Sequence, residues 1–163
     1  MAPRLKTSGN PAASRRGELE HIEQVHLILW TDGGEIADRY PNARKIFAIP
    51  NGGHRNVVVA AKLKAEGVRA GIPDLFFPEA RGGYFGLWIE MKIRPNRPSA
   101  EQVQRMAQLN ADGYLAVICW SAEEAQTLLR WYLSLDPTPR CARATPPSWV
   151  RAPARGGARR APR

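Results

Sequence analysis

Two acidic residues and a lysine lie at the ends of neighbouring strand-like segments. Glu90 and Lys92 are two positions apart in one segment, so in a strand their side chains point to the same face of the sheet and Met91 points to the other. Asp74 begins the preceding strand-like segment. If the turn between the two segments is centred near Gly82, Asp74 and Glu90 are equally far from it and pair across a hairpin. We therefore expect two carboxylates and an ammonium group at one end of a sheet.

Paired carboxylates of this kind suit divalent-metal chemistry. Two close carboxylates repel each other unless a proton or a cation lies between them. A hard ion such as Mg²⁺ takes oxygen ligands and keeps several waters, which supply a nucleophile. Lys92 would then stabilise charge on the attacking water or in the transition state, an arrangement that suits a phosphodiester substrate. The structural alternative is a modestly stabilising ion pair between strands. Both acids, however, adjoin the apolar runs 75–77 and 87–89, where a surface ion pair is less expected.

The segments that must position these groups alternate between helical and extended patterns. Apolar spacing and turn signals predict helices over 18–30, 56–66, 100–112 and 122–134, and strands over 46–49, 74–77, 84–92 and 114–120. Capping-box sequences, Ser99 with Gln102 and Ser121 with Glu124, open the last two helices. The order predicts an α/β fold with a mixed four-stranded sheet flanked by helices. The short turn implies an antiparallel hairpin, and the helix between the last two strands implies a parallel crossover.

The composition excludes several classes of protein. The chain has 163 residues, of which 44% are apolar, and its 24 basic and 15 acidic residues give a net charge of +9. No apolar run approaches the roughly 18 residues that a membrane-spanning helix requires. Two cysteines are too few for a disulfide framework or a Cys-rich zinc module, and the N-terminus lacks the apolar stretch of a signal peptide. We therefore expect a cytoplasmic protein that does not associate with membranes.

The positive charge is concentrated at the two ends. Residues 1–17 carry four basic residues and 137–163 carry seven, with no acid in either, whereas 18–136 holds 13 basic and 15 acidic residues. We predict a basic disordered tail over 1–17, one folded domain over 18–136, and a disordered tail rich in Arg, Pro and Ala over 137–163. Such arms bind nucleic-acid phosphates by releasing counterions, although a solvated tail without a partner would have the same composition.

The acids and the lysine belong to a longer series of motifs. The series runs Glu20-His21-Ile22-Glu23-Gln24, Ala48-Ile49-Pro50-Asn51-Gly52-Gly53, Gly67-Val68-Arg69-Ala70-Gly71-Ile72-Pro73-Asp74, Ala80-Arg81-Gly82-Gly83-Tyr84, Glu90-Met91-Lys92 and Ser99-Ala100-Glu101-Gln102. In this order the motifs resemble the VRR-NUC (virus-type replication-repair nuclease) family of the PD-(D/E)XK nuclease superfamily, in its small stand-alone phage or bacterial form. The resemblance covers about residues 18–134 and implies a restriction-endonuclease-like PD-(D/E)XK core.

The resemblance assigns roles to the residues of the hairpin. The family's metal-binding acids map onto Asp74 and Glu90, and its catalytic lysine maps onto Lys92. In this superfamily the backbone carbonyl of the residue at Met91 commonly completes the metal shell. The implied cofactor is Mg²⁺ or Mn²⁺.

The resemblance also implies two contributions from helices. The family uses a glutamate on the first helix, which maps best onto Glu20, where it assists catalysis or holds a second ion. Glu23 is a rival that spacing does not exclude. Gln102 matches a glutamine on the helix that follows the lysine strand, and its capping-box role is an equally good explanation.

The implied activity is metal-dependent endonucleolytic cleavage of DNA, selective for structure in the manner of a Holliday-junction resolvase, in phage or bacterial replication, repair or recombination. We expect branched or duplex DNA as partner, and a homodimer, because a junction needs two symmetric cuts. Candidate DNA contacts are Arg55, Arg69, Arg94 and Arg97, although Arg55 follows glycines that are also typical of a plain turn. The alternatives are a nickase or flap nuclease, and a non-catalytic nucleic-acid-binding protein on a nuclease-like core.

Overall fold

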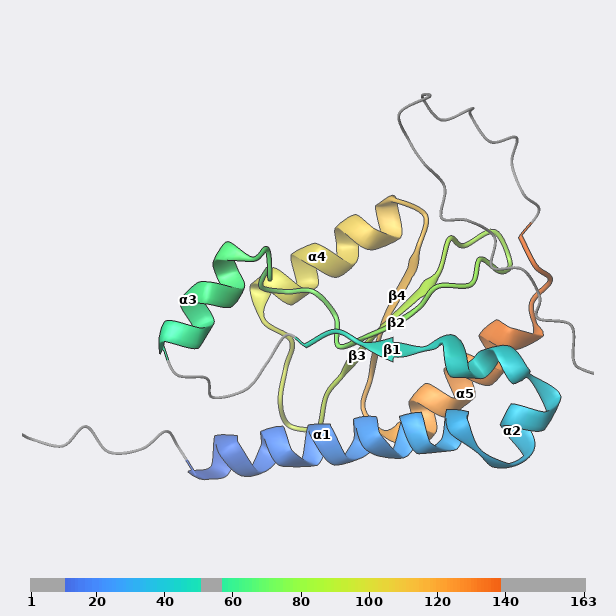
Figure 1. Cartoon of the computed structure of the whole chain (residues 1–163), viewed down its shortest axis with the longest axis horizontal. Coiled ribbons are helices and arrows are strands. Elements are labelled where there is room, and N and C mark those ends of the chain that lie inside the picture. The colour runs from blue at the N-terminus through green and yellow to red at the C-terminus, as the bar shows by residue number, and fades with distance from the viewer. Residues whose placement is uncertain (1–10, 51–56, 139–163) are drawn as a thin grey trace, which may run out of the picture.

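The computed structural model describes residues 11–50 and 57–138, and it contains the mixed α/β architecture that the sequence predicts. The elements are α1 (Pro11–Asp32), α2 (Gly34–Arg39), the 3₁₀ helix η1 (Pro41–Lys45), β1 (Phe47–Ala48), α3 (Val57–Ala65), β2 (Leu75–Phe77), β3 (Leu87–Met91), α4 (Ala100–Ala111), β4 (Leu115–Cys119) and α5 (Ala122–Ser134). Figure 1 shows α4 on one side of the strands and α1 with α5 on the other.

The four strands form one sheet in the order β1-β2-β3-β4. β2 runs antiparallel to both β1 and β3, whereas β3 and β4 are parallel and are joined by α4. Leu75 pairs with Ile89 and Phe77 pairs with Leu87, so the hairpin has the register predicted from a turn centred near Gly82. The predicted antiparallel hairpin and parallel crossover are both confirmed.

One face of this sheet carries the hydrophobic core. Alternate side chains of β2 and β3 are fully or almost fully buried there, and they pack against the inner faces of α1 and α5. The core members from these elements are Leu27, Leu75, Phe77, Leu87, Ile89, Met91, Leu129, Tyr132 and Leu133. Because successive strand residues point to opposite faces, the intervening positions, including Asp74 and Glu90, point toward the side where α4 lies.

Helix α4 is fixed at both of its ends. The Ser99 side chain accepts a hydrogen bond from the amide of Gln102, and the Gln102 side chain accepts one from the amide of Ser99, which completes the predicted capping box. At the other end, Asn110 bonds both the amide and the carbonyl group of Ala116 in β4. Two amide groups at the start of α4, those of Ser99 and Gln102, are thereby satisfied, and the end of the helix is held to β4.

The structure departs from the predicted boundaries at the N-terminus. α1 begins at Pro11, so residues 11–17 are helical although their composition predicted a tail. The physical reason is local, because proline suits the first position of a helix and Ala12 and Ala13 are strong helix formers. The helices α2 and η1, between Gly34 and Lys45, were not predicted. They are too short for a helical repeat of apolar residues to show in the sequence.

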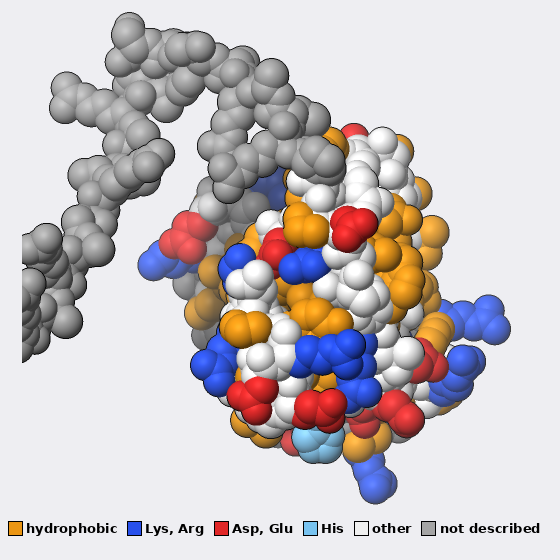
Figure 2. Space-filling view, turned by 90° about the vertical axis from the view of Figure 1, so that its right-hand side faces the viewer, with side chains coloured by type: hydrophobic (Ala, Val, Ile, Leu, Met, Phe, Trp, Pro, Cys, Tyr) orange, Lys and Arg blue, Asp and Glu red, His pale blue; other side chains and the backbone are white. Residues whose placement is uncertain are grey.

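The folded part of the chain also extends slightly beyond its predicted end. Pro137 forms an isolated bridge with Arg81, and the amide of Thr138 donates to the carbonyl of Ala80. The remaining tail predictions, for 1–10 and 139–163, lie outside the described residues, as does Arg55. No helix in the described ranges is long and apolar enough to cross a membrane. In Figure 2, basic and acidic side chains are mixed on the end of the molecule formed by α2 and the end of α5, without a patch of single sign.

A close contact between the loop before β2 and the start of α4 leads to a stability prediction. Gly71 has a φ of +80°, and a Cβ built on it would lie 2.6 Å from the carbonyl oxygen of Glu101. Gly83 has a similar φ of +89° but no neighbour within 4 Å. We expect Gly71→Ala to lower the free energy of unfolding by about 1–3 kcal/mol more than Gly83→Ala, because only the first adds a clash to the backbone strain. Urea unfolding of the two variants measures this, and equal losses would show that the contact is not tightly packed.

Candidate active site

The β2–β3 hairpin places the two acids side by side. Asp74 immediately precedes β2 and lies opposite Glu90 when the register of the hairpin is extended by one residue. Asp74 Oδ2 accepts a hydrogen bond of 2.9 Å from the amide of Met91, which fixes the carboxylate at the end of β3. The approach of Gly71 to Glu101 brings the preceding loop against α4. The position of Asp74 is therefore set by backbone geometry on both of its sides.

Lys92 is held between carboxylates. Its Nζ lies 2.6 Å from Glu90 Oε1 and 3.8 Å from Glu20 Oε2, and its side chain is only 11% exposed. The backbone amide of Lys92 donates to the carbonyl of Cys119, which extends the pairing of β3 with β4 by one residue. The ammonium group thus points into the cluster of acids instead of into solvent.

The Gln102 side chain makes two contacts, one in the cap of α4 and one with Glu90. Its side-chain oxygen accepts from the amide of Ser99 in the capping box, while its Nε2 donates to Glu90 Oε1. A glutamine can do this because its amide group has an acceptor and a donor at opposite ends. The cap of α4 and the orientation of Glu90 are therefore coupled through one side chain.

The structure separates Glu20 from Glu23. Glu20 Oε1 accepts hydrogen bonds from Asn96 Nδ2 at 2.7 Å and from the amide of Ile93 at 3.3 Å, and its other oxygen faces Lys92. Glu23 Oε2 instead accepts from the amide of Ala122, at the first residue of α5. Glu23 lies three residues further along α1, and its side chain points to the start of α5 instead of to Lys92. Glu20 therefore lies in the cluster, whereas Glu23 caps another helix.

Asn96 joins the cluster although its sequence pattern did not single it out. It lies in the polar loop Arg94–Pro98, whose composition is typical of any turn. Its side chain bonds Glu20, and the amide of Ile93 in the same segment bonds Glu20 as well. The first helix therefore holds the chain that immediately follows Lys92. No local pattern could reveal this contact, because its partners are 76 residues apart.

Burial dominates the electrostatics of the two acids. Burial, with a smaller contribution from the neighbouring charge of Asp74, raises the pKa of Glu90 to about 7, although the hydrogen bond from Lys92 acts in the opposite direction. The pKa of Asp74 is also raised, chiefly by burial, although the Met91 amide and Lys92 oppose the shift. Near neutral pH, either a proton or a bound cation would therefore relieve the repulsion between the two carboxylates.

Lys92 remains charged in this setting. Burial lowers the pKa of Lys92, but the hydrogen bond from its ammonium group to Glu90 and the attraction of the surrounding acids outweigh burial and leave the pKa above its ordinary value. A lysine that stays protonated cannot act as a general base. It can supply fixed positive charge, which favours the charge-stabilising role over proton abstraction.

The donor set fits a hard divalent ion. Glu90 is fully buried, yet its Oε2 has no hydrogen-bond partner among the described residues, which is costly for a carboxylate. Asp74 offers a second carboxylate beside it, and carboxylate oxygens are the ligands that Mg²⁺ and Mn²⁺ prefer. Within the described ranges no group of three or more His, Cys, Asp and Glu side chains could hold an ion. Asp74 and Glu90 would therefore need water or backbone oxygen, such as the Met91 carbonyl, to complete a shell.

The candidate DNA contacts lie outside this cluster. Arg69 is exposed and donates to the carbonyl groups of Lys64 and Val68, at the end of α3. Arg94 lies over the ring of Trp120, with its guanidinium carbon 4.7 Å from the ring centroid. Arg97 is exposed in the same loop. Arg94 and Arg97 therefore lie in the loop that follows Lys92, whereas Arg69 lies after the end of α3.

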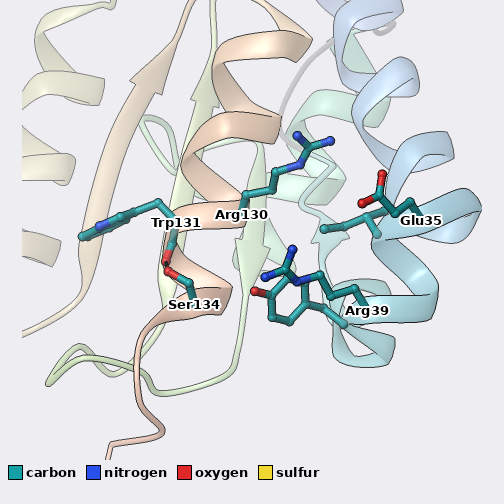
Figure 3. Close-up of a pocket in the computed structure, with 7 residues that line it drawn as sticks. Glu35, Arg39, Arg130, Trp131 and Ser134 are labelled. Carbon is teal, nitrogen blue, oxygen red and sulfur yellow. Dashed lines mark hydrogen bonds between the residues drawn. The ribbon is translucent and has the colours of Figure 1, made fainter.

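A hollow lies at the C-terminal end of α5, away from the carboxylate cluster. It has a volume of about 270 Å³ and is lined from α2 and the last turns of α5, with Arg39 and Arg130 among its residues (Figure 3). Glu23, three residues after the cluster residue Glu20 on α1, meets Ala122 at the first residue of α5, so the cluster lies nearer to this end of the helix. Roughly a dozen helical residues, or about 18 Å, separate the two ends of this helix. The hollow is therefore not part of the candidate active site.

Comparison with known proteins finds similarity over the part of the chain that contains this cluster. The family model for the VRR-NUC domain matches residues 20–123. A solved structure described as "VRR_NUC domain protein" is 30% identical in sequence, covers 73% of this chain and 91% of its own, and superposes with a TM-score of 0.62. No curated protein matches the chain. The matched stretch begins at Glu20 and includes every residue of the cluster.

The raised pKa of Glu90 predicts how metal-free stability depends on pH. The folded protein holds the Glu90 proton more tightly than the unfolded chain, so this residue destabilises the fold increasingly as pH rises from about 4.5 through about 7. Relative to Glu90→Gln, the wild type in EDTA should therefore lose several degrees of melting temperature between pH 5 and pH 8. Adding Mn²⁺ at pH 8 should restore the wild type and leave the variant unchanged. A difference that does not vary with pH would contradict this electrostatic description.

Proposed function

The chain belongs to the VRR-NUC domain family of nucleases, and from this membership and the geometry of Asp74, Glu90 and Lys92 we propose that it is a divalent-metal-dependent endonuclease that hydrolyses DNA phosphodiester bonds. The observation that carries the proposal is the adjacent pair of carboxylates, Glu90 fully buried and Asp74 half-buried, with Lys92 Nζ 2.6 Å from Glu90. Glu90 Oε2 has no hydrogen-bond partner among the described residues, which is consistent with a ligand that the protein itself does not supply.

The proposed roles follow from what each side chain contacts. Asp74 and Glu90 would hold Mg²⁺ or Mn²⁺, which when bound polarises the phosphodiester and lowers the pKa of the attacking water. Lys92 stabilises the negative charge that develops at the phosphate, because its ammonium group is protonated and points into the site. Gln102 orients Glu90 by donating to Oε1 and so leaves Oε2 directed elsewhere.

Glu20 is proposed to position the site instead of binding an ion. Its two oxygens already serve Asn96, Ile93 and Lys92, which leaves little capacity for a metal. Through these contacts Glu20 holds the segment after β3 and draws Lys92 toward the acids. We therefore replace the second-ion role expected for Glu20 with that of an anchor for the catalytic lysine.

The finer substrate assignment is also a proposal. A domain of this size has one catalytic cluster, so a branched DNA that needs two symmetric cuts requires two copies of the protein. We propose a structure-selective enzyme that acts on branched DNA as a homodimer, in phage or bacterial replication, repair or recombination. Arg94 and Arg97 are exposed in the loop that follows Lys92, which supports contact with DNA on this side of the site.

Removal of either charge from the cluster should abolish cleavage. We expect Asp74→Asn and Lys92→Ala each to lower kcat/KM by at least about 10²–10³-fold, since each removes charge stabilisation that acts in the transition state. The measurement is cleavage of labelled single-stranded, duplex, flap and four-way-junction DNA in Mg²⁺, Mn²⁺ or EDTA. The matched control is Lys62→Ala, because Lys62 belongs to an exposed ion pair with Glu66. Full activity in either site variant would refute the assignment.

Because Glu20 and Glu23 contact different parts of the fold, their alanine variants should differ in activity and in stability. We expect Glu20→Ala to lower kcat at least tenfold, because it releases Lys92 and the segment near Asn96. Glu23→Ala should leave kcat within twofold but cost about 1 kcal/mol of stability, because the start of α5 loses an acceptor. Steady-state cleavage and urea unfolding of both variants decide between them. The reverse pattern would show that Glu23 is the helix carboxylate of the site.

A further inference from the structure

Five aromatic rings form a continuous array beside the carboxylate cluster. Phe76 stacks on Trp88 with ring centroids 4.2 Å apart, and Phe47 meets Phe76 edge-to-face at 5.7 Å. Tyr114 contacts Phe76 and Trp88 at 6.1 and 6.4 Å, and it contacts Phe85 at 5.9 Å. These five rings together form what we call the aromatic array.

The array lies on the same face of the sheet as the acids. Phe76 follows Asp74 by two residues, and Trp88 precedes Glu90 by two, so the alternation of strands directs each ring to the side of its acid. Phe76 and Trp88 are directly paired across the hairpin, as Asp74 and Glu90 are in the extended register. The stacked rings are therefore displaced from the carboxylates by about 7 Å along each strand.

The array is separate from the hydrophobic core. The core lies on the other face, around Leu75, Phe77 and Ile89, and none of the five rings belongs to its buried cluster. Phe47 is 46% exposed and Phe85 is 55% exposed, at the two ends of the array. Large half-exposed rings at both ends of a ring cluster leave aromatic faces available for a ligand.

Two glycines make room for the rings. A Cβ built on Gly86 would lie 2.7 Å from the Phe76 ring, and one on Gly113 would lie 2.8 Å from the Phe85 ring. At the covered side of the face, α4 bonds β4 through Asn110 and Ala116, whereas Phe47 lies on β1 at the opposite edge of the sheet. The array therefore runs from the strand that α4 covers toward β1, the outer strand of the sheet in the described part of the chain.

We propose that the aromatic array stacks the unpaired bases of the DNA strand whose phosphate is cleaved at Asp74 and Glu90. The proposal rests on the function proposed above and specifies its substrate class: branched DNA with unpaired bases next to the scissile bond, at an opened branch point, a flap or a splayed arm. The site for a phosphate and the surface for bases lie on one face, at a separation along the strands that neighbouring groups of a single strand can span. Aromatic side chains bind single strands in this way without reading sequence.

The chemistry of the surface favours bases over other occupants. Its exposed groups are aromatic rings instead of aliphatic chains, and π-faces are what a base requires for stacking. The array also continues directly into a cluster whose lysine suits a phosphate. In a duplex the base faces are already covered by their neighbours, so the array should discriminate against fully paired DNA.

The test is binding of DNA in EDTA, where cleavage cannot occur. The probes are an oligodeoxynucleotide that contains 2-aminopurine and the same sequence as a duplex, added to the full chain. We expect Phe47→Leu and Phe85→Leu each to weaken single-strand binding by about 5- to 100-fold and to reduce quenching of 2-aminopurine fluorescence, with little change in duplex binding. Leucine preserves apolar volume, so thermal melting should show that both variants fold. Trp131→Leu is the matched control, because Trp131 is also 46% exposed but lies on α5, across the sheet.

The outcomes distinguish this inference from the proposed function. If the variants bind single strands as tightly as wild type, or if Trp131→Leu weakens binding equally, the array is not the base-stacking surface, although metal-dependent cleavage would stand. If the array variants lose single-strand binding but no metal supports cleavage by the wild type, the stacking surface stands and the proposed catalysis fails. Cleavage that prefers fully paired DNA over a flap, and that does not change in Phe47→Leu, would also overturn the inference.

Discussion

The cluster depends on one electrostatic conflict, which is the placement of two carboxylates side by side in a largely buried position. The β2–β3 register sets Asp74 opposite Glu90; burial raises the pKa of both, and the charge of Asp74 adds to the shift of Glu90. Lys92, 2.6 Å from Glu90, relieves only part of this cost, since Glu90 Oε2 has no partner among the described residues. Binding of a cation would relieve this conflict, so the destabilised pair and the proposed catalysis have one physical origin.

The remaining elements hold this conflict in place. α4 contributes Gln102, which connects its own cap to Glu90, and α1 contributes Glu20, which holds Lys92 and the segment at Asn96. The two faces of the sheet have different roles. The face toward α1 and α5 carries the apolar core, which leaves the other face for the acids and the aromatic array. Stability and chemistry are therefore separated by the alternation of strand residues, and a change on one face need not disturb the other.

The hairpin could be predicted from the sequence because its determinants are local. A turn signal near Gly82, flanked by strand-like runs, fixes both the pairing and the face of each side chain, so the spacing of Asp74, Glu90 and Lys92 along the chain is enough to identify them as partners. The capping box of Ser99 and Gln102 is also local, spanning three residues. By contrast, α2, η1 and the role of Asn96 left no local pattern, because they depend on contacts with distant parts of the chain.

The sequence by itself determined the order of the four strands and the longer helices, the register of the hairpin, and the type of chemistry that two acids and a lysine can support. The family motif mapped best onto Glu20, but spacing did not exclude Glu23, since both lie on α1 within one turn. Only the tertiary structure decided between them, by packing α1 so that Glu20 meets Lys92 while Glu23 meets the start of α5. The physical reason is that the apolar side chains of a helix fix its rotation about its axis by what they pack against. Leu27 of α1 is buried in the core with residues of the sheet and α5, and this sets the directions in which Glu20 and Glu23 point.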